Sequence, residues 1–290
     1  AIFGGGANLK LAIKNVHRQY APEMIGIATT CLSETIGDDV PGILDSIGNT
    51  IENTSLVHVA TPSYTGTHVD GFHQAVRAVV ERCNPINSRA KFKKKNAAPI
   101  NLFPGMLSNE DLRQLKEIFQ DFDTACTILP DYSERLEGPS WVSYQAIQQG
   151  GTPVNSIRKM NQASASFEFG TILDMLVENG TSSAGSYLEK NFSVPRIQLG
   201  IPIGTRPTDH FFSLLEEVTG KPTPEKYKRQ RGRLIDAYVD GNKYVSKKRA
   251  VVYGEEDFVA AMAGFLAEIG VVPVLCASGG NSGYLQKVLA

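Results

Sequence analysis

Short apolar runs alternate along the chain with longer stretches that carry apolar side chains at helical spacing. The runs are typical of buried parallel strands and lie at residues 24–28, 56–60, 99–103, 125–129, 197–203, 250–253 and 272–276. The helical stretches lie at residues 32–47, 71–83, 109–122 and 255–269. We expect Asn109 to cap the third of these helices, because the acidic residues of a first turn follow it. This alternation predicts an α/β fold with doubly wound, mostly parallel, Rossmann-like sheets flanked by helices.

The same pattern divides the chain into several predicted βα domains. A first α/β unit covers residues 1–95, and a second unit with helical insertions covers 96–247. Residues 248–290 are the start of a third, truncated Rossmann-like unit. The lysine-rich segment 91–95 is the predicted boundary loop. The sequence starts without an initiator Met and stops just after a strand and a Gly-rich turn, so we expect a piece of a longer polypeptide.

Composition narrows the class of protein. The chain has 290 residues, 42% of them hydrophobic, with 29 basic and 30 acidic side chains. This balance argues against a disordered chain and against a chain-wide nucleic-acid or anionic-membrane footprint. No apolar run approaches the ~20 residues that span a bilayer. The four cysteines are far apart and form no CxxC pair, which favours a reducing, cytoplasmic setting.

One candidate for chemistry is Cys31, which follows the first predicted strand and opens a helix. Amide groups and the macrodipole at a helix start stabilise a thiolate. A thiolate is the ligand that metals and iron–sulfur clusters require. The alternative is a small cysteine that merely packs at a strand end.

A second candidate is Ser63, which follows the second predicted strand. If the two strands are neighbours, Ser63 and Cys31 lie at the rim of one crevice. Ser63 could then be a nucleophile, a cluster ligand or a turn residue. No GxSxG motif surrounds it, so hydrolase chemistry has little support.

Glycine-rich turns lie at residues 4–6 and 279–283. Either turn could hold a phosphate on helix-end amides, but neither matches GxGxxG or the P-loop. Tight strand–helix turns are the favoured interpretation.

Two carboxylates, Asp236 and Asp240, are four residues apart and share one face of a helix. Their repulsion requires a cation between them. A hard metal ion is one solution, and a basic side chain such as Arg233 is the other.

Several of these motifs together resemble the nitrogenase component 1 (molybdenum-iron protein) β chains. Residues 29–39 and 61–72 resemble the central signatures of that family, and residues 2–5 resemble its Phe-Gly-Gly segment. The later blocks are similar at residues 231–236 and 253–258. Molybdenum-type chains are the most similar at 129–133, 138–139 and 150–153. The order and spacing of the motifs agree over nearly the whole chain.

The resemblance implies the β subunit of a dinitrogen reductase, an α2β2 oxidoreductase that is active only with its α chain and an ATP-hydrolysing iron protein. Its P-cluster, an iron–sulfur cluster shared with the α chain, relays electrons to the cofactor held there. Cys31 matches a cysteine ligand of this cluster, and Ser63 matches the serine that ligates iron on oxidation. Phe3 matches the aromatic residue that meets the iron protein. Asp236 and Asp240 match a mononuclear site, for calcium or iron, between two β chains.

One departure from the family concerns the cluster ligands. The family's other two β-chain cysteines lie upstream of the Phe-Gly-Gly segment, where this sequence begins, and the last third of the β chain is also missing. An internal fragment is therefore expected. The alternatives are a cofactor-assembly scaffold, a nitrogenase-like reductase of another substrate, or a vanadium or iron-only enzyme. A plain dinucleotide or nucleotide-sugar Rossmann protein lacks support, because no fingerprint is present. Retention of both Cys31 and Ser63 favours the catalytic subunit.

Overall fold

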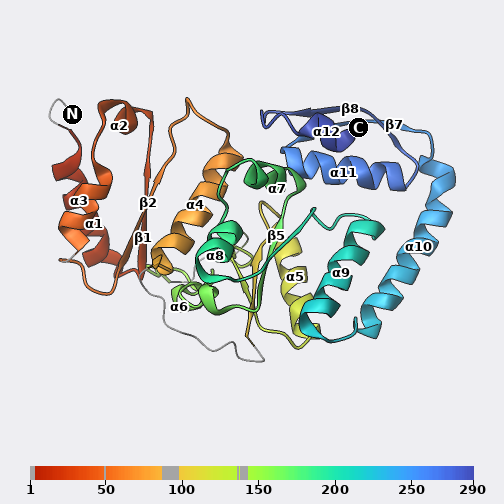
Figure 1. Cartoon of the computed structure of the whole chain (residues 1–290), viewed down its shortest axis with the longest axis horizontal. Helices are drawn as coiled ribbons and strands as arrows, with labels where there is room; N and C mark the ends of the chain where they lie inside the picture. Colours follow the sequence, from red (N-terminus) through yellow and green to blue (C-terminus); the bar gives the residue numbers. More distant parts are fainter. Residues whose placement is uncertain (1–3, 49, 87–97, 136, 138–142) are drawn as a thin grey trace.

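The computed structural model describes residues 4–48, 50–86, 98–135, 137 and 143–290. Within these residues the strands form three separate parallel sheets (Figure 1). The strands are β1 (Met24–Thr29), β2 (Ser55–Ala60), β3 (Ile100–Phe103), β4 (Cys126–Ile128), β5 (Ala165–Phe169), β6 (Arg196–Leu199), β7 (Arg249–Gly254) and β8 (Val272–Ser278). The α-helices are α1 (Gly6–Tyr20), α2 (Cys31–Ile36), α3 (Val40–Gly48), α4 (His68–Cys83), α5 (Asn109–Asp121), α6 (Val154–Ile157), α7 (Thr171–Glu178), α8 (Ala184–Phe192), α9 (Thr205–Thr219), α10 (Glu225–Val245), α11 (Glu256–Glu268) and α12 (Leu285–Leu289).

The central sheet has the strand order β4-β3-β5-β6, and all of its pairings are parallel. Within this sheet β3 comes first along the chain. The next strand, β4, pairs on one side of β3, and β5 and then β6 are added on the other side. This is a doubly wound sheet whose winding reverses between β3 and β5. It confirms the predicted fold class.

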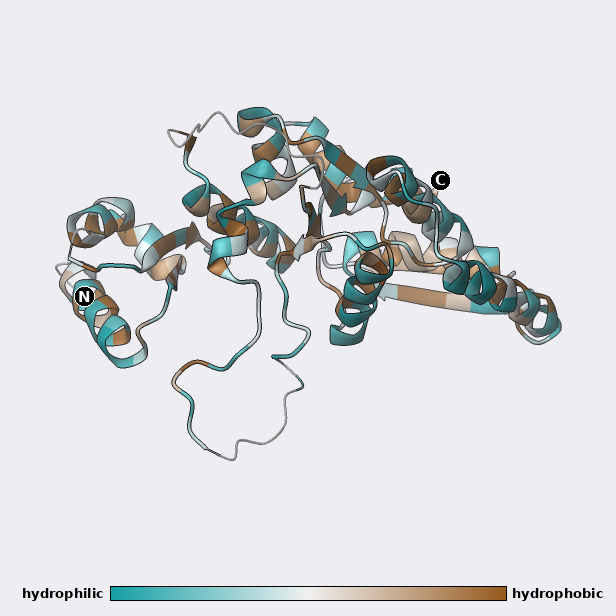
Figure 2. Cartoon of the chain, turned by 90° about the horizontal axis from the view of Figure 1, so that it is seen from below, coloured by the Kyte–Doolittle hydropathy of each residue, from teal (hydrophilic) through white to brown (hydrophobic). Residues whose placement is uncertain are grey.

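The outer sheets have two strands each, β1-β2 and β7-β8. Helix α4 lies between the first and central sheets, because it packs on β2 and also on α8 (Figure 1). Helix α11 packs on both β7 and β8. Apolar side chains of this sheet, among them those of Val251 and Leu275, are exposed. Figure 2 colours the ribbon of the chain by hydropathy, with hydrophobic residues in brown. The predicted boundaries at residues 95 and 247 stay a prediction, and the segment 91–95 lies outside the described residues.

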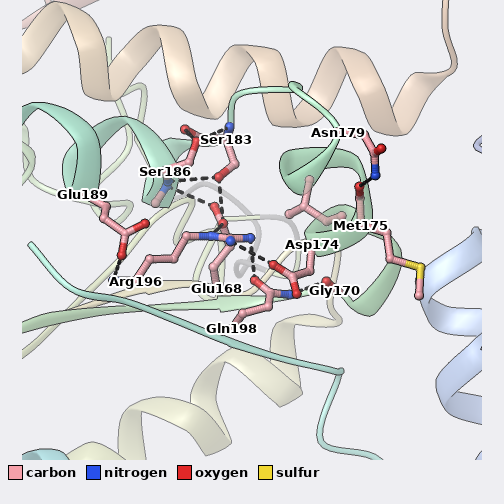
Figure 3. Close-up of polar contacts among 12 residues, drawn as sticks. Glu168, Gly170, Asp174, Met175, Asn179, Ser183, Ser186, Glu189, Arg196 and Gln198 are labelled. Atoms are coloured by element: carbon pink, nitrogen blue, oxygen red, sulfur yellow. Dashed lines mark hydrogen bonds and ion pairs between the residues drawn. The ribbon is translucent and has the colours of Figure 1, made fainter.

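Strand β5, at the centre of the central sheet, is missing from the sequence-based prediction. All five of its residues are buried, but one of them is Glu168, which interrupts the apolar run. Glu168 is 2% exposed and accepts a hydrogen bond from Arg196 Nε at 2.6 Å (Figure 3). Arg196 also donates to Asp174, at 2.8 Å, and to Gln198, at 2.7 Å. A buried charge is tolerated only when it is paired in this way.

Carboxylates from distant elements cap several helix starts. Glu168 accepts hydrogen bonds from the Gly185 amide at the start of α8, at 3.0 Å, and from the Ser183 hydroxyl, at 2.7 Å. Helix α11 supplies two more caps. Its Asp257 accepts from the first amides of α7, those of Ile172 (2.7 Å) and Leu173 (3.2 Å). Its Glu268 accepts from the first amide of α9, that of Thr205, at 3.0 and 3.1 Å. Burial raises the pKa of Asp257 to about 6.

The residues before α7 and α9 must be glycines for these caps to form. Gly170 has φ +133° and Gly204 has φ +91°, which L side chains rarely adopt. A Cβ atom on Gly204 would lie 2.4 Å from Glu268 Oε2, and one on Gly170 would lie 2.8 Å from Asp257 Oδ2. The glycines thus let the carboxylates approach the helix ends closely.

Two local predictions are wrong. The single helix predicted over residues 32–47 is two helices, α2 and α3, because Gly37 adopts the left-handed conformation at φ +75° and ends α2. The cap of α5 is Ser108 and not Asn109. The Ser108 hydroxyl accepts from the Asp111 amide, and the Asp111 carboxylate accepts from the Ser108 amide, which is a capping box.

We predict that the buried ion pair of Arg196 is essential for stability. Replacing Arg196 with Met leaves Glu168 buried without its cation and should lower the free energy of unfolding in urea by about 3–5 kcal/mol. Arg229→Met is the control, because Arg229 pairs with the exposed Glu225 on the same helix and its loss should cost at most about 1 kcal/mol. Equal losses for the two variants would contradict this prediction.

Candidate metal-cluster site

Parallel pairing of β1 with β2 brings Cys31 and Ser63 together. The register aligns Thr29 with Ala60 at the carboxyl ends of the two strands. Each strand then turns outward, one into Cys31 and the other into Ser63. Cys31 Sγ lies 2.7 Å from Ser63 Oγ and accepts a hydrogen bond from the Ser63 amide at 3.2 Å. The two residues therefore lie side by side at the carboxyl ends of neighbouring strands.

Cys31 is chemically different from other cysteines of the chain. It is the first residue of α2, where helix amides favour a thiolate. The Ser63 hydroxyl, and next the Ser63 amide, hold the pKa of the Cys31 thiol below its usual value. Burial raises the pKa of Cys83 and of Cys126. Of these three thiols, Cys31 is therefore the one whose pKa most favours the thiolate form that binds a metal.

The surroundings of this pair are apolar and exposed. Leu32 is 65% exposed, Tyr64 is 60% exposed and Ile36 is 48% exposed. Contiguous exposed apolar side chains are typical of a surface that meets another protein. Across the described part of the chain, no three His, Cys, Asp or Glu residues gather where they could hold a metal ion. Cys31 and Ser63 can therefore supply two donors of a larger ligand set.

Two threonines, Thr29 and Thr61, precede Cys31 and Ser63 in the chain and were not predicted as site residues from the sequence. The carbonyl oxygen of Thr29 accepts from the amide of Thr61 at 3.0 Å and from its hydroxyl at 2.9 Å. Each threonine lies two residues before one member of the pair. That shared spacing is the signal in the sequence that could have indicated them.

The glycine-rich turns are tight turns whose geometry is set by polar side chains. The Gly5 amide, before α1, donates to Asp38 Oδ1 at 3.1 Å. A Cβ atom on Gly4 would lie 2.8 Å from the same oxygen. After β8, the Gly280 amide donates to Ser278 Oγ at 3.0 Å. A protein carboxylate thus occupies the position at α1 that a phosphate would take.

Asp236 and Asp240 lie on the long helix α10, and both are exposed. Their spacing places them on one helical face. Neither carboxylate forms an ion pair with another described residue. Arg231, which precedes them, pairs with Asp209 at 2.7 and 2.8 Å. The same helix exposes Val239, at 71%, and Tyr244, at 67%. Phe3 lies outside the described residues.

The fold and the site define a doubly wound α/β protein with a thiol and a hydroxyl at the carboxyl ends of two neighbouring strands. The sequence matches the family described as nitrogenase component 1 type oxidoreductase over residues 1–289. The chain therefore belongs to that family. No helix in the described residues has both the length and the hydropathy needed to cross a membrane.

Named relatives agree with this assignment. The chain is 34% identical to the nitrogenase molybdenum-iron protein beta chain of Clostridium pasteurianum, over 99% of its own length and 60% of that protein's. It is 27% identical to the nitrogenase iron-molybdenum cofactor biosynthesis protein NifN of Bradyrhizobium diazoefficiens, with the same coverage of 99% and 60%. A solved structure titled "Nitrogenase Cp1 at pH 6.5" superposes with a TM-score of 0.88 at 32% identity, covering 99% of this chain and 61% of that one. This chain therefore spans less than two thirds of the length of these relatives.

We predict that Ser63 controls the acidity of Cys31. Ser63→Ala removes the hydroxyl that lowers the pKa of the thiol, so the midpoint of Cys31 alkylation by iodoacetamide should move to higher pH. Peptide mass spectrometry separates Cys31 from the other cysteines. Ser46→Ala is the control, because the Ser46 hydroxyl donates to the Ile43 carbonyl, away from Cys31. An unchanged midpoint in Ser63→Ala would refute the assigned cause.

Proposed function

We propose that this chain is part of the β subunit of a nitrogenase component 1 that reduces dinitrogen, with Cys31 and Ser63 as ligands of its P-cluster. The observation that carries this proposal is the 2.7 Å contact between Cys31 Sγ and Ser63 Oγ, at the end of two paired strands. The greater identity to a molybdenum-iron β chain than to the cofactor-biosynthesis protein NifN supports the catalytic subunit.

The donor chemistry of the pair fits an iron–sulfur cluster. The lowered pKa of Cys31 favours the thiolate that ligates iron. Ser63 offers an oxygen beside it, which can bind iron when the cluster loses electrons. When bound, the cluster would relay electrons from the iron protein to the cofactor of the α chain. Its remaining ligands come, in this proposal, from the α chain and from residues outside this sequence.

The α chain is the proposed partner at the cluster. A cluster shared between two subunits requires Cys31 and Ser63 to face the partner. Leu32, Ile36 and Tyr64, which are close to the pair in sequence, have exposed side chains that supply apolar contact area. The four free cysteines are compatible with the reducing, cytoplasmic setting that such a cluster needs.

A second β chain is the proposed partner at α10. Asp236 and Asp240 offer carboxylate oxygens on one exposed face, and Val239 and Tyr244 offer apolar contact area on the same helix. A calcium or iron ion there would need further oxygens from the other β chain, from backbone or from water. Its role would be structural. Docking of the iron protein at Phe3 stays a prediction from the resemblance.

We predict that Cys31 is required for the cluster. Cys31→Ala in the complete β chain, expressed with its α chain, should deplete P-cluster iron and abolish electron delivery for dinitrogen reduction. Ser63→Ala should keep the iron but alter the spectrum of the oxidised cluster. Cys276→Ala is the control, because Cys276 lies on β8, away from the pair. Iron content equal to the unmodified complex in Cys31→Ala would overturn the proposal.

We also predict that Asp236 and Asp240 hold the assembly together through a metal ion. Converting both to Asn should lower the stability of the tetramer and make its dissociation insensitive to a chelator, with P-cluster spectra unchanged. Asp209→Asn is a matched control, since this exposed carboxylate pairs with Arg231. Chelator sensitivity that persists in the double variant would exclude the metal site.

A further inference from the structure

The ladder between β1 and β2 does not stop at the last paired residues of the two strands. Beyond Ala60, the Thr61 amide still donates to the Thr29 carbonyl oxygen, at 3.0 Å. The next residue, Pro62, has no N–H to continue the ladder. The Thr61 hydroxyl donates to the same carbonyl oxygen instead, at 2.9 Å. The two strand ends are thus joined by two hydrogen bonds at the last point before they separate.

The side chain of Thr29 extends this connection to α2. Thr29 is 5% exposed, and its hydroxyl donates to Glu34, in the first turn of α2. His58 Nε2, on β2, lies 3.3 Å from the same hydroxyl oxygen. One buried hydroxyl therefore contacts both the neighbouring strand and the helix that begins with Cys31.

Few contacts hold Ser63 itself in place. Ser63 is exposed, and its neighbours Tyr64, Thr65 and Gly66 are exposed as well. The contacts that the structure gives the Ser63 amide and hydroxyl are those with Cys31. A separation of 2.7 Å between Sγ and Oγ thus depends on how the preceding residues are fixed.

We propose that Thr29 and Thr61 are positioning residues that set the separation of Cys31 and Ser63, through hydrogen bonds made two residues before each of them. This inference rests on the proposed function in one respect: the separation is proposed to hold two ligands in place for a cluster. The geometry itself can be tested in this chain without iron.

The test measures how readily a disulfide forms between the two positions. Ser63→Cys places a second thiol beside Cys31. In a glutathione buffer the two protein thiols give two electrons and two protons to oxidised glutathione. An S–S bond forms between them, the S–S bond of glutathione breaks, and two molecules of reduced glutathione are released. The equilibrium constant of this exchange reports how well the protein holds the two sulfur positions together. Peptide mass spectrometry after acid quenching measures it.

Thr29→Val and Thr61→Val, each in the Ser63→Cys background, keep the β-branched shape and remove the hydroxyl. Because a net hydrogen bond is worth about 1 kcal/mol, each should lower the equilibrium constant about fivefold. Thr29→Ser and Thr61→Ser restore a hydroxyl and should restore the constant. Thr50→Val is the remote control, since Thr50 donates to the Ile47 carbonyl, and it should leave the constant unchanged.

A second measurement covers a valine variant that is too unstable for the exchange. Amide hydrogen exchange in a segment containing Ser63, with the native Ser63 in place, should become faster in each valine variant and remain slow in each serine variant. Equal disulfide constants in the valine and serine variants would overturn the proposal. So would the absence of any disulfide in Ser63→Cys with both threonines intact. Failure of the iron-content test with Cys31→Ala would leave this result untouched, so the two proposals fail separately.

Discussion

The interaction on which the arrangement of this chain depends is the bond between a carboxylate and the free amides of a distant helix start. The first amides of an α-helix have no partner within the helix and carry partial positive charge. In this protein Asp257 and Glu268 satisfy those of α7 and α9 from the two ends of α11. Glu168 does so for α8 from within the central sheet. The helices and sheets are therefore joined at defined points by charge, in addition to their apolar cores.

These caps also decide which strand ends are available for chemistry. Helix starts that follow parallel strands are the usual anion sites of doubly wound folds. Here acidic side chains of the protein occupy two of them, at α7 after β5 and at α9 after β6. Asp38 takes the equivalent position at the Gly5 amide before α1. At α2 the N-cap residue, Thr30, makes no side-chain hydrogen bond to the helix start, and the first helical residue is Cys31. Hydrogen bonds from the Ser63 hydroxyl and amide, supplied by the neighbouring strand end, lower the pKa of this thiol.

The sequence indicated much of this, for reasons that can be stated in physical terms. Apolar runs located every described strand except β5, and the parallel pairing of β1 with β2 placed Cys31 beside Ser63. Strand β5 was not predicted because Glu168 interrupts its apolar run. Arg196, the cation that pairs with Glu168, is distant in sequence. The break between α2 and α3 depends on the conformation of Gly37, which composition alone does not reveal. The roles of Thr29 and Thr61 depend on a register that only the paired strands define.

Helix α11 has a consequence for how the polypeptide is completed during its synthesis. Residues 171–178 and 205–219, which form α7 and α9, are synthesised before Asp257 and Glu268. Until then the first amides of the two helices lack their carboxylate caps. The backbone of the preceding glycines, Gly170 and Gly204, is not restricted by those caps. The caps of α7 and α9 are therefore supplied by a segment that is translated after them. A ribosome that pauses before residue 257 holds a nascent chain in which both helices lack these caps.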